Sequence, residues 1–121
     1  MLTNCSSDNG NYGESNIFTG KAFIREQNTM VSSGVYGYEV LYFEDNKNGT
    51  AFYVDKNHNV LVSQSPIHFT FWRSKDVLEI AYHYSNGSVE SYLYNIKSSR
   101  SFEMTRNDKR RSYVYDHLIH L

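Results

Sequence analysis

The chain has little of several features that often fix the structure of small proteins. Its 121 residues include one cysteine, Cys5, and one proline, Pro66. A single cysteine excludes an intramolecular disulfide and a zinc site built from cysteines. The formal net charge is −1, so the clearly basic surface that favours nucleic-acid binding is absent. No apolar run approaches the roughly 18 residues of a membrane-spanning helix.

Aromatic side chains are what the sequence has in abundance. The chain contains 11 tyrosines and 7 phenylalanines, and aromatic residues favour β-strands. Runs with helical period are hard to find, whereas Asn, Asp, Ser and Gly recur at short intervals, as many short strands require. A chain of this length fits one domain that buries its own core. We therefore expect a single all-β domain.

The first 16 residues differ from the rest. They are polar, rich in Gly and Asn, and without hydrophobic period. Such a composition is typical of a flexible segment outside the core. The sequence thus predicts an N-terminal tether over 1–16 and a folded domain over 17–121.

Residues 2–5, which end in Cys5, resemble the end of a bacterial lipoprotein signal. In such signals the cysteine is lipidated and becomes the mature N-terminus. This resemblance implies a protein of the bacterial cell envelope, periplasmic or anchored to the outer membrane, which touches the membrane only through a lipid on Cys5. The alternative is a lone free thiol on a disordered terminus, because the basic and apolar regions of a signal peptide do not precede the cysteine.

Strict alternation of apolar residues predicts antiparallel hairpins from residue 67 onward. The runs 67–72 and 78–84 are separated by the polar residues 73–76, and a hairpin folded there gathers its apolar residues on one face. Residues 85–88 are a strong turn signal before a third run over 91–96, and two further turns follow at 97–100 and 107–110. The predicted pairs are Phe71 with Leu78, Phe69 with Ile80, Ile67 with Tyr82, Tyr82 with Tyr92, Ile80 with Tyr94, Leu78 with Ile96, Phe102 with Ile96, and Tyr115 with Phe102.

The N-terminal half is less regular. Strands are expected over 18–24, 38–44, 50–54 and 60–64, and residues 26–37 have little pattern and read as a long connection, a lid or a short helical turn. The register of 38–54 stays open, because both faces carry apolar residues.

About eight strands in sequence order would leave an open sheet with two edges and an uncovered face. Closure into a single antiparallel up-and-down β-barrel solves both problems. An eight-stranded barrel is filled by side chains or holds one small ligand. The expected interior consists of Ile67, Phe69, Phe71, Leu78, Ile80, Tyr82, Tyr92, Tyr94, Ile96, Phe102, Met104, Tyr113 and Tyr115.

Three segments carry a family resemblance: 42–52 (YFEDNKNGTAF), 69–72 (FTFW) and 77–80 (VLEI). With them, the chain from about residue 18 to 116 resembles the small bacterial lipocalin-like β-barrel domains, many of them lipoproteins. The resemblance implies a calycin-type barrel that binds a small apolar molecule or a protein and shares no enzyme activity.

The tyrosines are the main candidate for a site. A buried tyrosine hydroxyl needs a hydrogen-bond partner, and several phenols at one end of a barrel would make a polar cavity for a small apolar or amphipathic ligand. The alternative is a fully packed Tyr-rich core without a ligand, in a structural envelope lipoprotein or one that binds a protein partner. The ligand-binding candidates are Tyr82, Tyr84, Tyr92, Tyr94, Tyr113, Tyr115, Phe69 and Phe71.

A protein partner would need an exposed apolar patch, which we expect around Phe43, Trp72, Val77 and Leu93. The basic turn with Arg106, Lys109, Arg110 and Arg111 could grip an anionic ligand or partner, although such clusters are more often solvated hairpin tips.

Catalytic motifs are missing, so no catalytic residue and no cofactor is predicted, and the protein is expected not to be an enzyme. His68 and His83 share an outward face, and with Glu79 or Glu90 they could form a metal site of two histidines and a carboxylate. Two solvent-facing histidines are the favoured interpretation, so no metal is predicted.

Overall fold

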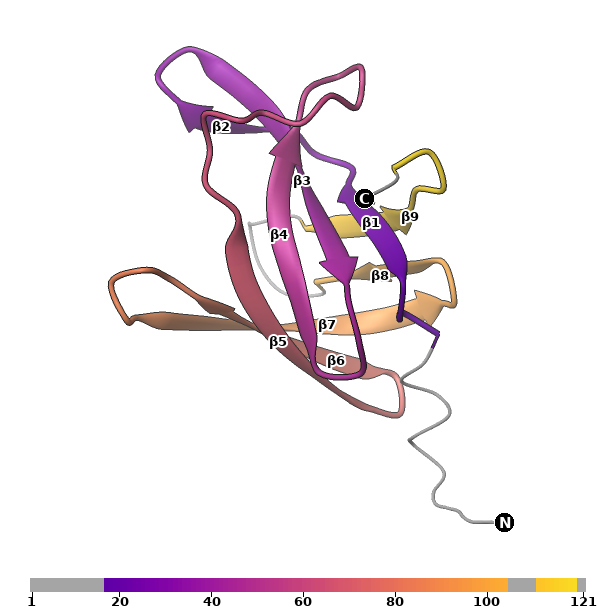
Figure 1. Cartoon of the computed structure of the whole chain (residues 1–121). Coiled ribbons are helices and arrows are strands. Elements are labelled where there is room, and N and C mark those ends of the chain that lie inside the picture. The colour runs from indigo at the N-terminus through magenta and orange to yellow at the C-terminus, as the bar shows by residue number, and fades with distance from the viewer. Residues whose placement is uncertain (1–16, 105–110, 120–121) are drawn as a thin grey trace.

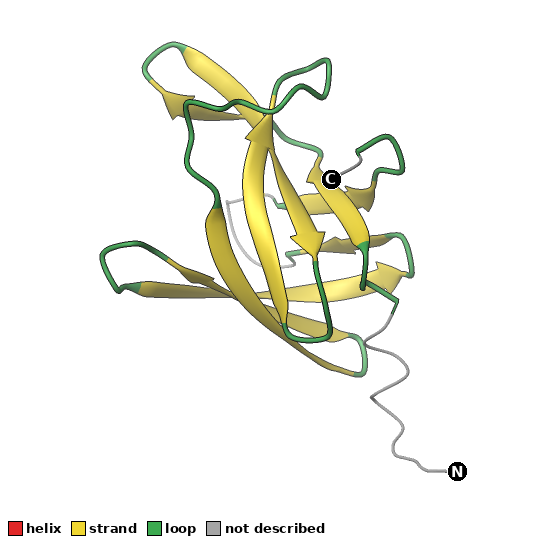
Figure 2. Ribbon diagram, in the orientation of Figure 1, coloured by secondary structure: helices red, strands yellow, loops and turns green. Residues whose placement is uncertain are grey.

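The computed structural model describes residues 17–104 and 111–119. These residues form nine β-strands joined by turns and loops, with no helix among them (Figures 1 and 2). No helix that could cross a membrane is present in this part of the chain. The strands are β1 (Lys21–Arg25), β2 (Thr29–Ser32), β3 (Val35–Phe43), β4 (Asn48–Val54), β5 (Ile67–Ser74), β6 (Val77–His83), β7 (Val89–Ser98), β8 (Ser101–Glu103) and β9 (Ser112–Tyr115).

The strands close into an antiparallel barrel. From β3 to β9 each strand pairs with the next in sequence, and β1 closes the sheet by pairing with β9 on one side and β3 on the other. Eight strands therefore form the barrel, and β2 pairs only with the first part of β3, as a hairpin that extends from the barrel wall (Figure 1). This confirms the predicted all-β up-and-down barrel and is consistent with a calycin-like fold. Closure satisfies the edges that an open sheet would expose.

The hairpin of β5 and β6 has the predicted face but not the predicted register. Phe69 pairs with Tyr82 and Phe71 with Ile80, two residues away from the expected partners. The cause is the turn: Ser74 pairs with Val77, so only Lys75 and Asp76 form the loop. Lys75 has a φ of 55°, in the left-handed region that two-residue hairpin turns need. A slip of two residues keeps the same side chains inside, since side chains alternate with period two.

The later hairpins repeat this outcome. Ile80 pairs with Tyr92 rather than Tyr94, and Phe102 pairs with Tyr113 rather than Tyr115. The pairing of Phe102 with Ile96 is confirmed. The inward face was predicted correctly throughout, whereas the pairing offset depended on turn lengths that alternation does not encode.

Two expectations for the N-terminal half are wrong. Residues 26–37 contain β2 and the start of β3 rather than an unstructured connection, and residues 60–64 form no strand. The region 60–64 contributes a single bridge, between Val54 and Val60, because β4 pairs directly with β5 and 55–66 serves as the loop between them.

The barrel interior is a cluster of mainly aromatic side chains. Every residue of the expected interior is either buried in this cluster or packed against it. The N-terminal half adds members that the sequence pattern leaves unassigned, namely Phe18, Phe23, Leu41, Phe43 and Ala51.

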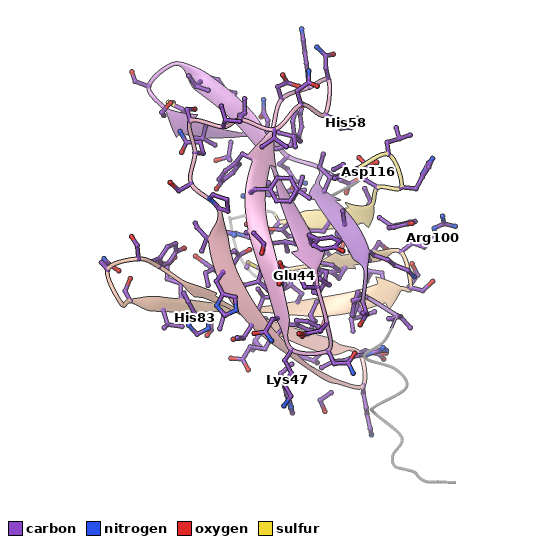
Figure 3. All side chains as sticks on the ribbon, in the orientation of Figure 1. Glu44, Lys47, His58, His83, Arg100 and Asp116 are labelled. Atoms are coloured by element: carbon purple, nitrogen blue, oxygen red, sulfur yellow. The ribbon has the colours of Figure 1, made fainter. Side chains whose placement is uncertain are left out.

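A second, smaller apolar cluster lies on the outside of the wall. Ala22, Val40, Phe52 and Val54 are buried there, and Ile119 of the C-terminal segment packs against them. That segment is held by the Asp116 amide, which donates to the Ala22 carbonyl, and by the contact between Nε2 of His58 and Oδ2 of Asp116 at 3.3 Å (Figure 3). Because the C-terminal segment covers this outer cluster, β3 and β4 are apolar on both faces. For the same reason their register could not be read from the sequence.

Gly49 lies where the barrel wall has no room for a side chain. A Cβ at this position would lie 2.5 Å from the Tyr42 carbonyl oxygen and 2.6 Å from Cε1 of Phe69. Because one obstacle is backbone and the other a fully buried ring, Gly49→Ala should lower the free energy of unfolding by about 3 kcal/mol. Urea denaturation measures this. Gly34→Ala is the control: its φ is +75° with no atom within 4 Å, so it should cost about 1 kcal/mol. Equal losses would contradict the steric argument.

Candidate functional site at the tyrosine end of the barrel

The barrel interior has two chemically different parts. One is a Phe cluster, in which Phe43 packs against Phe18 at 5.1 Å and Phe71 at 4.8 Å between ring centroids. The other is a Tyr cluster, formed by Tyr82, Tyr94 and Tyr113 around the carboxylate of Glu39. The two meet where Phe102 packs on Tyr94 and stacks on Tyr113. The polar side chains of the Tyr cluster therefore lie in one half of the barrel interior, the half in which β3 begins.

Glu39 is the central polar group of the Tyr cluster. Its side chain is buried, with 4% of the residue exposed, and it accepts a hydrogen bond of 2.5 Å from the Tyr113 hydroxyl. The Arg111 side chain faces this carboxylate, and its Nη1 lies 3.9 Å from Oε1 of Glu39. This distance gives electrostatic attraction but is too long for a hydrogen bond. The guanidinium instead lies over the ring of Tyr92, 4.2 Å from its centroid.

Three buried hydrogen-bond donors in this cluster have no acceptor among residues 17–104 and 111–119. The Tyr82 and Tyr94 hydroxyls and Nε of Arg111 are inaccessible to solvent and make no hydrogen bond within this part of the chain. The two hydroxyls lie near each other and near the Tyr113 hydroxyl, yet none of these contacts has hydrogen-bond geometry. An unmet buried donor costs about 1–3 kcal/mol. Natural proteins rarely leave such groups unmet, unless water, an ion or a ligand completes them.

Burial keeps these phenols in the neutral, donating form. It raises the pKa of Tyr82 and Tyr113 well above the ordinary value and raises that of Tyr94 as well. The negative charge of Glu39 acts in the same direction. At neutral pH the cluster therefore presents O–H groups, not phenolates.

A half-buried layer lies beside the Tyr cluster. The Tyr84 hydroxyl donates to Oε1 of Glu90 at 2.7 Å, and Tyr92 donates to the same oxygen at 3.3 Å. The rings of Tyr84 and Tyr92 both pack on Tyr82, at 6.4 and 5.7 Å between centroids. Because Glu90 is exposed, this layer connects the buried phenols to solvent.

The structure brings most of the predicted site residues together. Tyr82, Tyr84, Tyr92, Tyr94 and Tyr113 are contiguous, as the preceding contacts show. Phe69 packs on Phe71 in the Phe cluster and also reaches Tyr82, at 6.4 Å between ring centroids. Phe71 belongs to the Phe cluster, and Tyr115 packs on Phe23 and lies beneath the cations of Lys21 and Arg100. Cys5 lies outside the described residues.

Two important residues were missed or misread at the sequence level. Glu39 alternates with Leu41 and Phe43, so its inward direction was available once the register was known. Arg111 was grouped with the basic turn, where a solvated tip was the favoured reading, but its side chain is only 18% exposed and faces Glu39. Arg111 lies two residues before Tyr113, so both side chains face the same way. This alternation was the sequence signal that Arg111 points into the barrel. Arg106, Lys109 and Arg110 lie outside the described residues.

The histidine pair lies on the outer face. His68 and His83 are directly paired, with ring centroids 5.3 Å apart. Nε2 of His68 is hydrogen-bonded with Oδ1 of Asn48 at 3.0 Å, and Nε2 of His83 is hydrogen-bonded with Oγ1 of Thr70 at 2.9 Å. Figure 3 labels His83. Over residues 17–104 and 111–119, no three His, Cys, Asp or Glu side chains are arranged to hold a metal ion. The arrangement gives no support to the two-histidine, one-carboxylate site.

The expected apolar patch is present in part. Trp72 and Leu93 are 61% and 57% exposed and flank Glu79 in one cross-strand row, and Val77 is 38% exposed beside them. Phe43 is fully buried in the Phe cluster, so its place in this patch was wrong. The tight alternation of β3 puts Phe43 inside together with Leu41.

Comparisons with protein-family models, with curated proteins and with solved structures found no match.

Proposed function

We propose that this protein is a non-enzymatic binding protein, whose barrel takes up a small amphipathic molecule at the Tyr cluster. The observation that carries the proposal is the set of three buried donors, on Tyr82, Tyr94 and Arg111, for which the described part of the chain supplies no acceptor. A polar group of a ligand would satisfy them, and the rings of Tyr84 and Tyr92 would contact its apolar part.

The size of the ligand follows from the packing of the Phe cluster. Phe18, Phe43, Phe69 and Phe102 are fully buried and fill the other half of the interior. A long acyl chain running through the barrel would have to displace these rings, at the cost of disrupting a close-packed core. A short or flat molecule near the Tyr cluster fits the arrangement better.

The cellular location of the protein is part of the same proposal. We expect the domain to work in the bacterial cell envelope, tethered through a lipid on Cys5. Mass spectrometry of the protein purified from its native host tests this directly, because an acylated cysteine changes the mass of the N-terminal peptide. An unmodified Cys5 in a membrane-free fraction would contradict it.

The binding proposal is tested by native mass spectrometry of the full chain, followed by calorimetric titration with small amphipathic compounds. We expect 1:1 binding, and we expect Tyr94→Phe to weaken it about tenfold, the usual worth of one buried hydrogen bond. Trp72→Ala, on the exposed outer face, is the control and should leave binding unchanged. Absence of any bound compound, in the purified protein and in the titrations, would contradict the proposal.

A second candidate function is docking of an envelope protein on the outer face of β5, β6 and β7. The exposed Trp72, Leu93 and Val77 favour it, since large apolar side chains that gather on one surface often mark an interface. Crosslinking in the native host separates the two functions: Trp72→Ala combined with Leu93→Ser should abolish a specific crosslink here but should leave ligand binding unchanged.

A further inference from the structure

We infer that the polar group of the ligand is a carboxylate, which the guanidinium of Arg111 and the hydroxyls of Tyr82 and Tyr94 receive together. The inference rests on the proposed function and specifies the chemical class of the ligand. It follows from the balance of donors and acceptors and from the position and charge of Arg111.

The unmet groups of the site are all donors, so the ligand group has to be an acceptor. The unmet groups on Tyr82, Tyr94 and Arg111 all have a hydrogen to donate. The Oε1 atom of Glu39 already accepts the Tyr113 hydroxyl. An ammonium group, which only donates, would leave the three donors unmet, whereas a carboxylate offers about four acceptor positions.

Glu39 and Arg111 carry opposite charges beside the phenols. Burial raises the pKa of Tyr94, the negative charge of Glu39 raises it further, and the positive charge of Arg111 lowers it. An anionic group of a ligand therefore fits on the side of Arg111 and not beside Glu39.

Arg111 is held ready for such a partner. Its guanidinium stacks on Tyr92 at 4.2 Å and lies 3.9 Å from Glu39 without bonding to it. Stacking fixes the plane of the guanidinium and leaves its edge for hydrogen bonds. Arginine binds carboxylates through two parallel N–H···O bonds, which are stronger than neutral hydrogen bonds.

A matched series of ligands tests the inference on the full chain at pH 7.5. The compounds are 2-naphthoate, 2-naphthamide and 2-naphthylmethylamine, which share one ring system and differ in the polar group. By calorimetry we expect the acid to bind at least tenfold more tightly than the amide and the amine to bind most weakly. The amide separates the acceptor requirement from the charge requirement.

Variants identify the residues responsible. Arg111→Gln should reduce the affinity for the acid at least tenfold, to that of the amide, and should change the affinity for the amide less than threefold. Arg111→Lys keeps the charge but loses Nε and should recover only part of the preference. Tyr94→Phe should weaken acid and amide alike, since its hydroxyl donates to either. Circular dichroism and thermal unfolding confirm that each variant is folded.

The outcomes separate the two proposals. If the acid, the amide and the amine bind equally well, ligand binding stands and the carboxylate inference is overturned, as it is if the amine binds best. The same holds if Arg111→Gln keeps the preference for the acid. If none of the three binds while native mass spectrometry also shows an empty protein, the proposed function itself fails, and ordered water is left as the partner of the buried donors.

Discussion

Above pH 10 the protein is expected to lose stability steeply and to unfold within about two to three pH units. Burial raises the pKa of Tyr82, Tyr113 and Tyr94 in the folded state, whereas in the unfolded chain these phenols ionise near pH 10. Above pH 10 the unfolded state therefore holds fewer protons than the folded state, and the free energy of unfolding falls as the pH rises. Below pH 10 this contribution is fully present.

The size of the effect follows from the number of phenols. Each phenol that ionises only in the unfolded state lowers the free energy of unfolding by about 1.4 kcal/mol per pH unit. The three buried phenols Tyr82, Tyr94 and Tyr113 together contribute a slope of about 4 kcal/mol per pH unit while they stay protonated in the folded state, which is large against the 5–15 kcal/mol that stabilises a typical domain.

Urea denaturation at a series of pH values from 8 to 12 measures the slope. Tyr94→Phe should reduce it by about 1.4 kcal/mol per pH unit, because it removes one phenol and leaves the bond between Tyr113 and Glu39 in place. Tyr36→Phe is the matched control, since Tyr36 is 55% exposed, and should keep the wild-type slope. A wild-type slope in Tyr94→Phe would show that the Tyr94 hydroxyl ionises as readily in the folded protein as in the unfolded chain.

The inward face of the barrel was predictable from the sequence, but the pairing of its strands was not. Apolar alternation assigns a side chain to a face, and a slip of two residues preserves that assignment. The actual offset depends on Lys75, a residue with a positive φ that ordinary turn rules do not expect there. The tyrosines of β6, β7 and β9 therefore appeared on the correct face, beside partners two residues away from those expected.

The charged groups of the candidate site depended on contacts between distant parts of the chain. Glu39 and Tyr113 are 74 residues apart, and their bond exists only because β1 joins β9 to β3. The apolar outer face of β3, which obscured the direction of Glu39, exists because the C-terminal Ile119 covers it. Local pattern could propose the phenols, but it could not place a carboxylate and a guanidinium among them.

Phe18→Ala is expected to lower the free energy of unfolding by about 3–5 kcal/mol, the usual cost of truncating a buried phenylalanine. Phe18 lies outside every strand, yet it is fully buried. Its ring packs on those of Phe23, Phe43 and Phe102, at 5.4, 5.1 and 5.9 Å between centroids. The ring fills the space between these three phenylalanines at the end of the barrel that holds the Phe cluster. Its removal should leave a cavity, because the strands of a closed barrel cannot move together to fill it.

Urea denaturation of Phe18→Ala, Phe18→Leu and the control Trp72→Ala tests this role. Phe18→Leu keeps most of the apolar volume and should lose less than half as much, whereas the exposed Trp72 should cost about 0.5 kcal/mol or less. If Phe18→Ala lowered the free energy of unfolding by less than about 1 kcal/mol, the Phe18 ring would not be an essential part of the packing of the Phe cluster. Because the Phe and Tyr clusters lie in different halves of the interior, folded Phe18→Ala should bind the naphthalene ligands with unchanged preference. Stability and recognition would then be assigned to opposite ends of one barrel.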